Sequence, residues 1–239
     1  MISEYPMTKS SVPFTVIFED NHLLVVNKSP GILVQGDATG DVPLVELGKQ
    51  YIKEKYRKPG EVFLGVVHRL DRPVSGVVVL ARTSKALERM NALFREKETV
   101  KTYWAIVRSK PPQPEGTLIH WLQKDEKKNK TTVYKKETGN ALRSELSYKV
   151  LGSAEGHWLL QVNPVTGRSH QIRAQLASMG CPIKGDVKYG DDTANEDGSI
   201  YLHARRLSFI HPVKKEPITL EAPVPVMGIW KYFVKFDET

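Results

Sequence analysis

The chain has 239 residues, of which 40% are hydrophobic and 26% charged, and 35 lysines and arginines outnumber 27 acids. This composition is typical of a globular protein with room for one sizeable core, and no apolar run is long enough to cross a bilayer. The single cysteine excludes an intramolecular disulfide and a cysteine metal cluster. The net charge of +8 favours a polyanionic partner such as a nucleic acid.

Hydrophobic patterning predicts a series of interspersed strands and helices after a polar start. We expect residues 1–13 to be a flexible segment and residues 14–239 to be one domain. The expected strands are residues 14–18, 23–26, 77–81, 102–107 and 159–162, and the expected helices are residues 43–55, 84–97 and 169–179. This order lacks a regular βαβ rhythm and predicts a mixed, mainly antiparallel α+β fold.

Two helix ends carry recognisable signals. Asp41 precedes the helix expected at 43–55 and is its candidate cap. Gly180 follows the helix expected at 169–179 and suits the left-handed position past its end.

Residues 124–136 carry six lysines against two acids, which is typical of a solvated hairpin or loop, with an RNA contact as the alternative.

A carboxylate between two arginines is the first candidate for chemistry. Asp71 lies between Arg69 and Arg72 in a polar, turn-like segment with apolar residues on both sides. The neighbouring cations favour the ionised carboxylate, which suits a nucleophile or base better than an acid. A structural ion pair with the same arginines is an equally valid interpretation.

Arg168, His170 and Arg173 form a second basic cluster at a predicted loop-to-helix junction. Free N–H groups at a helix start favour anions, so Arg168 can hold a phosphate there. Arg173 either pairs with an acid from another element, for which Asp71 is the obvious candidate, or lies on a solvated helix face. No histidine pair has the spacing of a zinc-binding helix, so we expect no metal site.

Tyr103 and Trp104 are adjacent on an expected strand and therefore point to opposite faces of the sheet. One of them faces the core. The other is free to stack on a base, as recognition of single-stranded RNA often requires.

Several segments, in this order, resemble the motifs of the RluA-type pseudouridine synthases across roughly residues 16 to 225. They are Val25-Val26-Asn27-Lys28-x-Pro30-Gly31, His68-Arg69-Leu70-Asp71-Arg72-x-x-Ser75-Gly76, Lys101-x-Tyr103-x-Ala105-x-Val107, Thr166-Gly167-Arg168-x-His170-Gln171-Ile172-Arg173, Gly185-Asp186-x-x-Tyr189-Gly190, Leu202-His203-Ala204 and His211-Pro212. The chain departs from the family pattern at Pro73-Val74 and at Ala174-Gln175. Pro73 fixes one backbone dihedral and stiffens the loop that carries Arg72.

The resemblance implies the pseudouridine synthase catalytic fold with a central cleft, and isomerisation of a uridine to pseudouridine in structured rRNA or tRNA. It implies that Asp71 is the catalytic carboxylate, acting by covalent attack or by removing a sugar proton. It further implies that Tyr103 packs against the target base, that Arg173 pairs with Asp71, and that Arg72 helps to flip the nucleotide out of its stack. No metal or organic cofactor is implied.

The expected RNA-binding residues are Arg69, Arg72, Arg168, His170, Lys28 and Lys101. Many relatives carry an N-terminal S4-type RNA-binding domain, which we do not expect here, so RNA binding would rest on the catalytic domain. We expect a cytoplasmic monomer with an RNA partner and no membrane association.

Two other functions compete with this interpretation. A non-catalytic RNA-binding or assembly factor on the same fold would be expected to lose Asp71, Tyr103 or Arg173, and all are present. A glycosidase needs a second carboxylate, and nothing acidic accompanies Asp71 in the motifs.

Overall fold

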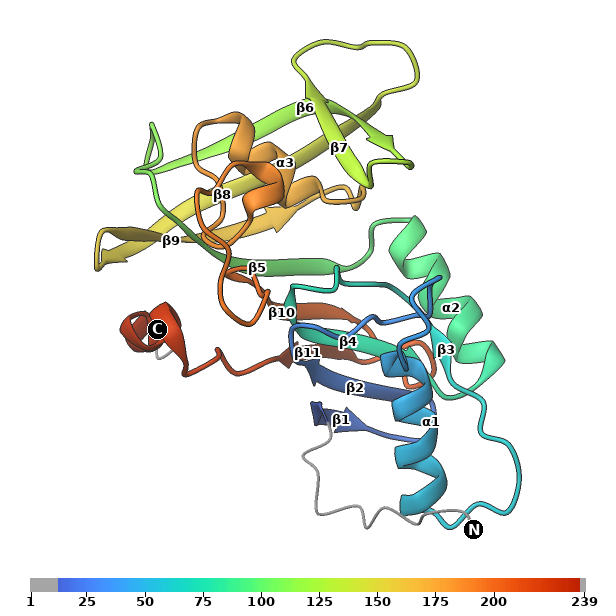
Figure 1. The fold of residues 1–239 in the computed structure, drawn as a ribbon. Helices are drawn as coiled ribbons and strands as arrows, with labels where there is room; N and C mark the ends of the chain where they lie inside the picture. Colours follow the sequence, from blue (N-terminus) through green and yellow to red (C-terminus); the bar gives the residue numbers. More distant parts are fainter. Residues whose placement is uncertain (1–12, 237–239) are drawn as a thin grey trace.

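The computed structural model describes residues 13–236, so the predicted flexible segment 1–13 lies outside it except for its last residue. Figure 1 shows the strands crossing the whole molecule, with the helices on their faces. The strands are β1 Phe14–Glu19, β2 Leu23–Lys28, β3 Gly65–Val66, β4 Ser75–Ala81, β5 Val100–Val107, β6 Glu115–Asp125, β7 Lys130–Tyr134, β8 Leu142–Ala154, β9 His157–Pro164, β10 Leu202–Ile210 and β11 Pro217–Glu221. The helices are α1 Leu44–Lys55, α2 Ser84–Arg95 and α3 Gln171–Ser178, with the short 3₁₀ turns η1 Val187–Tyr189, η2 Gly228–Tyr232 and η3 Val234–Phe236.

All of these strands belong to one sheet. Its order is β1-β2-β4-β10-β5-β9-β8-β6-β7, with β3 also beside β4 and β11 also beside β10. The strand pairs are antiparallel except β4 and β10, which run parallel where Ser75 and Gly76 face His203 and Ala204. The predicted mixed, mainly antiparallel α+β fold is therefore confirmed.

The core lies on both faces of the sheet because its central strands are apolar at successive positions. In β4, Val78 and Leu80 join the largest cluster, to which α1 and α3 both contribute, so these two helices cover the same face. Val77 and Val79 point to the other face and pack with α2. This is the two-residue alternation of a strand that is buried on both sides.

The helix ends confirm part of what the sequence indicates. The Thr83 hydroxyl caps α2 by accepting the Ala86 N–H at 3.1 Å, and Gly180 has the expected left-handed backbone, with φ +84°. The prediction that Asp41 caps α1 is wrong, because α1 begins after Pro43 without a side-chain cap and Asp41 pairs with Arg72 instead. Helix α3 begins at Gln171 rather than residue 169, since His170 takes a left-handed conformation with φ 52°.

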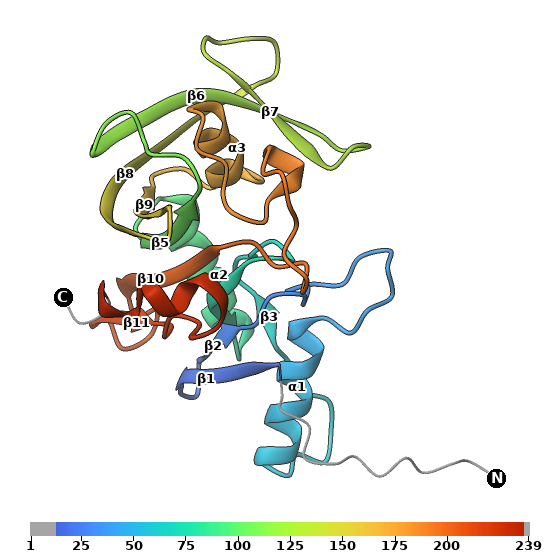
Figure 2. The ribbon, with the colours of Figure 1, turned by 60° about the vertical axis from the view of Figure 1, so that its left-hand side comes forward.

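Figure 2 shows the β6–β7 hairpin and α3 on one side of the molecule, and α1 with β1 and β2 on the other. The loop before β4 and strand β5 lie between these halves. Among residues 13–236, no helix is both long and apolar enough to cross a membrane.

Candidate active site

Two adjoining cavities open where the loop before β4 meets β5 and the start of α3. The smaller cavity, which we call inner, has a volume of about 130 Å³, and the larger one, which we call outer, has a volume of about 820 Å³. Most predicted site residues line both: Arg69, Asp71, Lys101, Tyr103, Arg168, His170 and Arg173. Arg72 lines the outer cavity alone. The motifs that are far apart in the sequence thus meet in one cleft.

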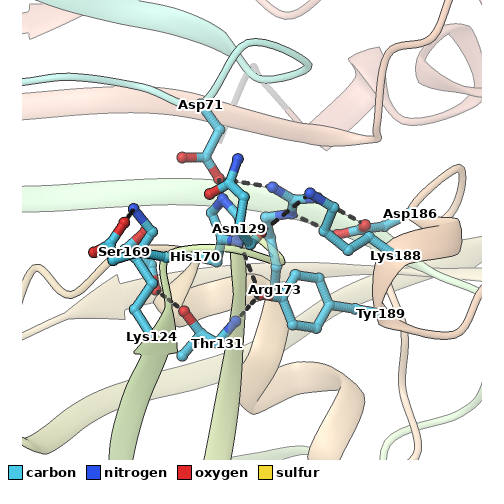
Figure 3. Close-up of polar contacts among 11 residues, drawn as sticks. Asp71, Lys124, Asn129, Thr131, Ser169, His170, Arg173, Asp186, Lys188 and Tyr189 are labelled. Atoms are coloured by element: carbon cyan, nitrogen blue, oxygen red, sulfur yellow. Dashed lines mark hydrogen bonds and ion pairs between the residues drawn. The ribbon is translucent and has the colours of Figure 1, made fainter.

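Asp71 presents its carboxylate to both cavities. A turn closed by the Val74 N–H donating to the Asp71 carbonyl at 3.0 Å fixes its backbone, and Val74 is buried beneath it. The Arg173 Nη1 donates to Asp71 Oδ2 at 2.9 Å, as Figure 3 shows. The contact expected between Arg173 and Asp71 is present, and the alternative of a solvated helix face is wrong, because Arg173 is 5% exposed.

Arg173 is held by a second acid whose role the sequence did not reveal. The Arg173 Nε and Nη2 donate to the two carboxylate oxygens of Asp186 at 2.7 and 2.9 Å, a bidentate pairing that fixes the plane of the guanidinium. Burial acts to lower the pKa of Arg173, but Asp186 and Asp71 more than offset it and raise that pKa. Asp186 therefore fixes the cation that contacts Asp71.

Asp186 corrects the expectation that the motifs place no acid beside Asp71. It is a second carboxylate on the same arginine, but its side chain is 1% exposed and both of its oxygens are used by Arg173. It is therefore unavailable as an acid or base for a substrate. The only signal for it in the sequence was its place in the Gly185-Asp186 motif.

Tyr103 and Trp104 divide between the two faces of β5 as expected. Trp104 is buried in a cluster with Trp230, while Tyr103 lines both cavities beside Asp71. Burial raises the pKa of Tyr103, and the charge of Asp71 acts in the same direction. Its phenol is therefore neutral at ordinary pH and offers an aromatic face to the cleft.

The prediction that Lys28 binds RNA is wrong for the structure described here. Its side chain is 0% exposed, and its Nζ donates to the carbonyls of Ser29 and Ile32 at 2.9 Å each and of Arg72 at 3.3 Å. The side chain that was expected to bind RNA points inward. Lys28 instead joins the loop after β2 to the loop of Asp71.

The remaining predicted RNA-binding side chains form a basic wall around the cleft. Arg69 and Arg168 are exposed, and burial lowers the pKa of half-buried Lys101, with Lys97 adding to the shift. The Arg72 guanidinium pairs with Asp41 from the loop before α1. The side chain expected to flip the nucleotide is thus held at the rim of the outer cavity.

His170 is buried and joined to the η1 turn by one of its ring nitrogens. Its Nδ1 lies 2.8 Å from the Tyr189 hydroxyl, and its Nε2 lies 3.8 Å from Asp71 Oδ2. The Tyr189 ring lies 5.1 Å from the Arg173 guanidinium. Figure 3 shows these side chains meeting between α3, η1 and the β6–β7 hairpin.

The lysine-rich segment 124–136 forms the predicted solvated hairpin, β6–β7. Its Lys124 and Asn129 line the outer cavity, together with Lys188 from η1, and Lys188 donates to the Asn129 carbonyl at 3.1 Å. The opposite wall of this cavity is the segment Leu33 to Asp37. The cleft therefore has basic side chains contributed by the hairpin as well as by the loops that carry Arg69 and Arg168.

Within residues 13–236, no three histidine, cysteine, aspartate or glutamate side chains are grouped as a metal ion would require. Cys181 is buried. The inner cavity is lined by one carboxylate, that of Asp71, with the neutral phenol of Tyr103 and several cations around it, while the exposed Asp37 lines the outer cavity. This arrangement suits attack on, or proton removal from, a polyanionic substrate.

The family model described as RNA pseudouridylate synthase matches residues 22–178. Ribosomal large subunit pseudouridine synthase C of Vibrio cholerae serotype O1 is 32% identical over 235 residues, which cover 92% of this chain and 70% of that protein. Its counterpart in Vibrio vulnificus is 34% identical, and the match covers 87% of this chain and 65% of that protein.

Solved structures give the same result. Human RNA Pseudouridylate Synthase Domain Containing 4 superposes with a TM-score of 0.73 and 25% identity, covering 92% of this chain and 90% of that one. Human RNA Pseudouridylate Synthase Domain Containing 1 has a TM-score of 0.72 at 22% identity and supports the fold.

Proposed function

Since the chain belongs to the RNA pseudouridine synthase family and is an isomerase, we propose that it converts a uridine of a structured RNA to pseudouridine, with Asp71 as the catalytic carboxylate. The observation that carries this proposal is the position of Asp71. It is the accessible carboxylate of the inner cavity, and a buried arginine, itself fixed by Asp186, contacts it at 2.9 Å.

In the proposed reaction the bond between C1′ and N1 breaks, the uracil turns, and C5 bonds to C1′. The C5 proton leaves and N1 takes up a proton, so no atom is gained or lost. Asp71 either attacks C1′ or removes a sugar proton to give a glycal, and both routes use the same free carboxylate oxygen. The neutral phenol of Tyr103 favours packing against the turning base over removal of the C5 proton.

We further propose that the target nucleotide is flipped out of its helix. A base inside a stem cannot enter an inner cavity of about 130 Å³, so it must leave its stack at a cost of a few kcal/mol. Arg72 lines the outer cavity next to Asp71. Its guanidinium can take the place of the flipped base or hold a neighbouring phosphate.

Large-subunit rRNA is the substrate that we propose first, because the bacterial relatives are named for it, and tRNA is the alternative. A monomeric state stays a prediction. A cytoplasmic location stays a prediction. No observation favours a non-catalytic assembly factor over the enzyme.

The test is pseudouridine mapping of total RNA from a bacterial host with and without the chain. We expect at least one new pseudouridine with the wild type and none with Asp71→Asn, which keeps the size of the side chain but removes its charge. Asp192→Asn is the matched control, because Asp192 is an exposed acid outside the cleft and should not change the map. A new pseudouridine made by Asp71→Asn would contradict the role of Asp71.

A further inference from the structure

The Tyr189 hydroxyl joins two elements of the site, and the proposed reaction gives it no role. It accepts the backbone N–H of Thr131, from strand β7, at 2.8 Å, and it lies 2.8 Å from Nδ1 of His170. The Thr131 hydroxyl in turn donates to the Ser169 carbonyl at 2.9 Å. Figure 3 shows Thr131 and Tyr189 on one side of His170, and Asp71 on the other.

These contacts determine which nitrogen of His170 carries the proton. A phenol oxygen that accepts an N–H has its single proton left to donate. His170 Nδ1 lies 2.8 Å from that hydroxyl, and we assign it as the acceptor of the phenol proton. The neutral ring then carries its own proton on Nε2, the nitrogen that lies 3.8 Å from Asp71 Oδ2.

We propose that Tyr189 is a positioning residue, whose hydroxyl keeps His170 neutral with Nε2–H toward Asp71 and joins that ring to the β6–β7 hairpin. This inference rests on the proposed function, because it assigns a purpose to the state of Asp71. A neutral His170 leaves Arg173 as the one cation in contact with the carboxylate. A protonated His170 ring would be a second cation beside Asp71. It would stabilise the lone pairs of the carboxylate oxygens that must react and so make them less reactive.

Burial and the surrounding charges both act on the protonation state of His170. Asp71 and Asp186 favour the protonated ring, while Arg173 and Lys188 oppose it. Burial is the largest influence and lowers the pKa of His170. Because the Tyr189 hydroxyl donates to Nδ1, it stabilises the neutral ring further, and its loss should raise that pKa.

Tyr189→Phe tests the proposal, because it removes the hydroxyl and keeps the ring that contacts Arg173. Tyr201→Phe is the matched control, since the Tyr201 hydroxyl also accepts one backbone N–H, from Ile229 at 3.1 Å, and Tyr201 lines neither cavity. The probe is a large-subunit rRNA transcript labelled with tritium at C5 of uridine. Tritium release is followed in single-turnover reactions from about pH 5.5 to pH 8.5, on either side of the ordinary histidine pKa.

For Tyr189→Phe we expect a rate close to that of the wild type at the alkaline end and about tenfold lower near pH 6, because His170 then takes up a proton at higher pH. The dissociation constant for the transcript should stay within about twofold, since the hydroxyl contacts no RNA phosphate in this proposal. By NMR, the His170 ring should titrate about one pH unit higher than in the wild type. Tyr201→Phe should match the wild type in all three measurements.

His170→Asn provides a second variant that cannot be protonated, and asparagine tolerates the left-handed backbone at this position. The single-turnover rate of His170→Asn should not fall toward acid pH. The double variant that also carries Tyr189→Phe should likewise show no loss of rate at acid pH. If Tyr189→Phe does not fold, NMR of the wild type decides: a neutral His170 ring that carries its proton on Nδ1 overturns the proposal.

An unchanged pH profile and an unchanged His170 titration in folded Tyr189→Phe would also overturn it, as would an equal loss of rate at every pH. The NMR titration needs no activity. A wild type that forms no pseudouridine would therefore reject the proposed function, while the titration would still decide the inference.

Discussion

The Nζ of Lys28 lies inside the protein with three backbone carbonyls around it, from Ser29, Ile32 and Arg72. Because Arg72 follows Asp71 directly, this amine ties the loop after β2 to the backbone of the loop that carries Asp71. Burial lowers the pKa of Lys28 to about 7, although the charge of Asp71 acts against the shift. A buried lysine with this pKa links stability to pH.

The free energy of unfolding should therefore rise with pH above about 7. Between the folded pKa and the ordinary value of 10.5 the unfolded chain binds the extra proton, so each pH unit adds at most about 1.4 kcal/mol. Urea unfolding at a series of pH values from about 6.5 to 9.5 measures this slope. Lys28→Met should abolish the slope, whereas Lys53→Met, at an exposed position, should keep it.

At the residue scale, the contact between Asp71 and Arg173 could be predicted because both charges needed a partner. The inward position of Lys28 could not be predicted, since lysine is almost never fully buried. Asp186 and Tyr189 were visible as motif residues, but their contacts depend on a left-handed His170 and on a hairpin distant in the sequence. Local patterns carry no information about such contacts.

The parallel pairing of β4 and β10 is the feature that positions the loop of Asp71. Asp71 lies four residues before β4, and at the start of that strand the Ser75 hydroxyl lies 2.8 Å from His203 Nδ1 of β10. Gly76 has φ +116°, and a Cβ at this position would collide with the backbone of Ala204. Only glycine permits this close approach of the two strands.

Gly76→Ala should therefore lower the free energy of unfolding by about 3 kcal/mol or more, because it adds backbone strain to a collision that neither strand can avoid. Thermal unfolding of the variant against the wild type measures the loss. Gly60→Ala is the control, since no atom lies within 4 Å of its added Cβ. Equal melting temperatures for the two variants would show that the strands can separate at little cost.

Strands and helices could be predicted where the hydrophobic periodicity lies within one short segment of the sequence. The strands near residues 14, 23, 77, 102 and 159 and the three helices form close to the expected bounds, as does the lysine-rich hairpin. The insertion of β10 between β4 and β5 was not predictable. Its position depends on pairing across the whole chain, which short patterns do not encode.

The molecule as a whole carries a net charge of +8, and part of that charge is gathered at the cleft. Lys124 from the hairpin and Lys188 from η1 line the outer cavity with the arginines of the catalytic loops. Such a surface attracts phosphates from a distance and releases their counterions on binding.

Replacing Lys124 and Lys188 together by glutamine should weaken RNA binding and flatten its salt dependence. Each phosphate contact contributes about 0.7 to 0.9 to the slope of log K against log salt, so losing two contacts should reduce it by about 1 to 2. Filter binding of the rRNA transcript at several salt concentrations gives the slope. A variant with Lys53→Gln and Lys58→Gln carries the same charge change on exposed residues away from the cleft and should keep the wild-type slope.

The central position of β10 in the sheet also determines the order in which the chain can fold as it is synthesised. A ribosome completes β4 by residue 81 and β5 by residue 107, but the strand that joins them is not synthesised until residues 202–210. Until then the nascent chain holds two sheet fragments, each with an unpaired inner edge of the kind that invites aggregation. Asp71 and Arg173, 102 residues apart, can keep their contact only after this late strand closes the gap, so the chain gains this site only once residues 202–210 have been made.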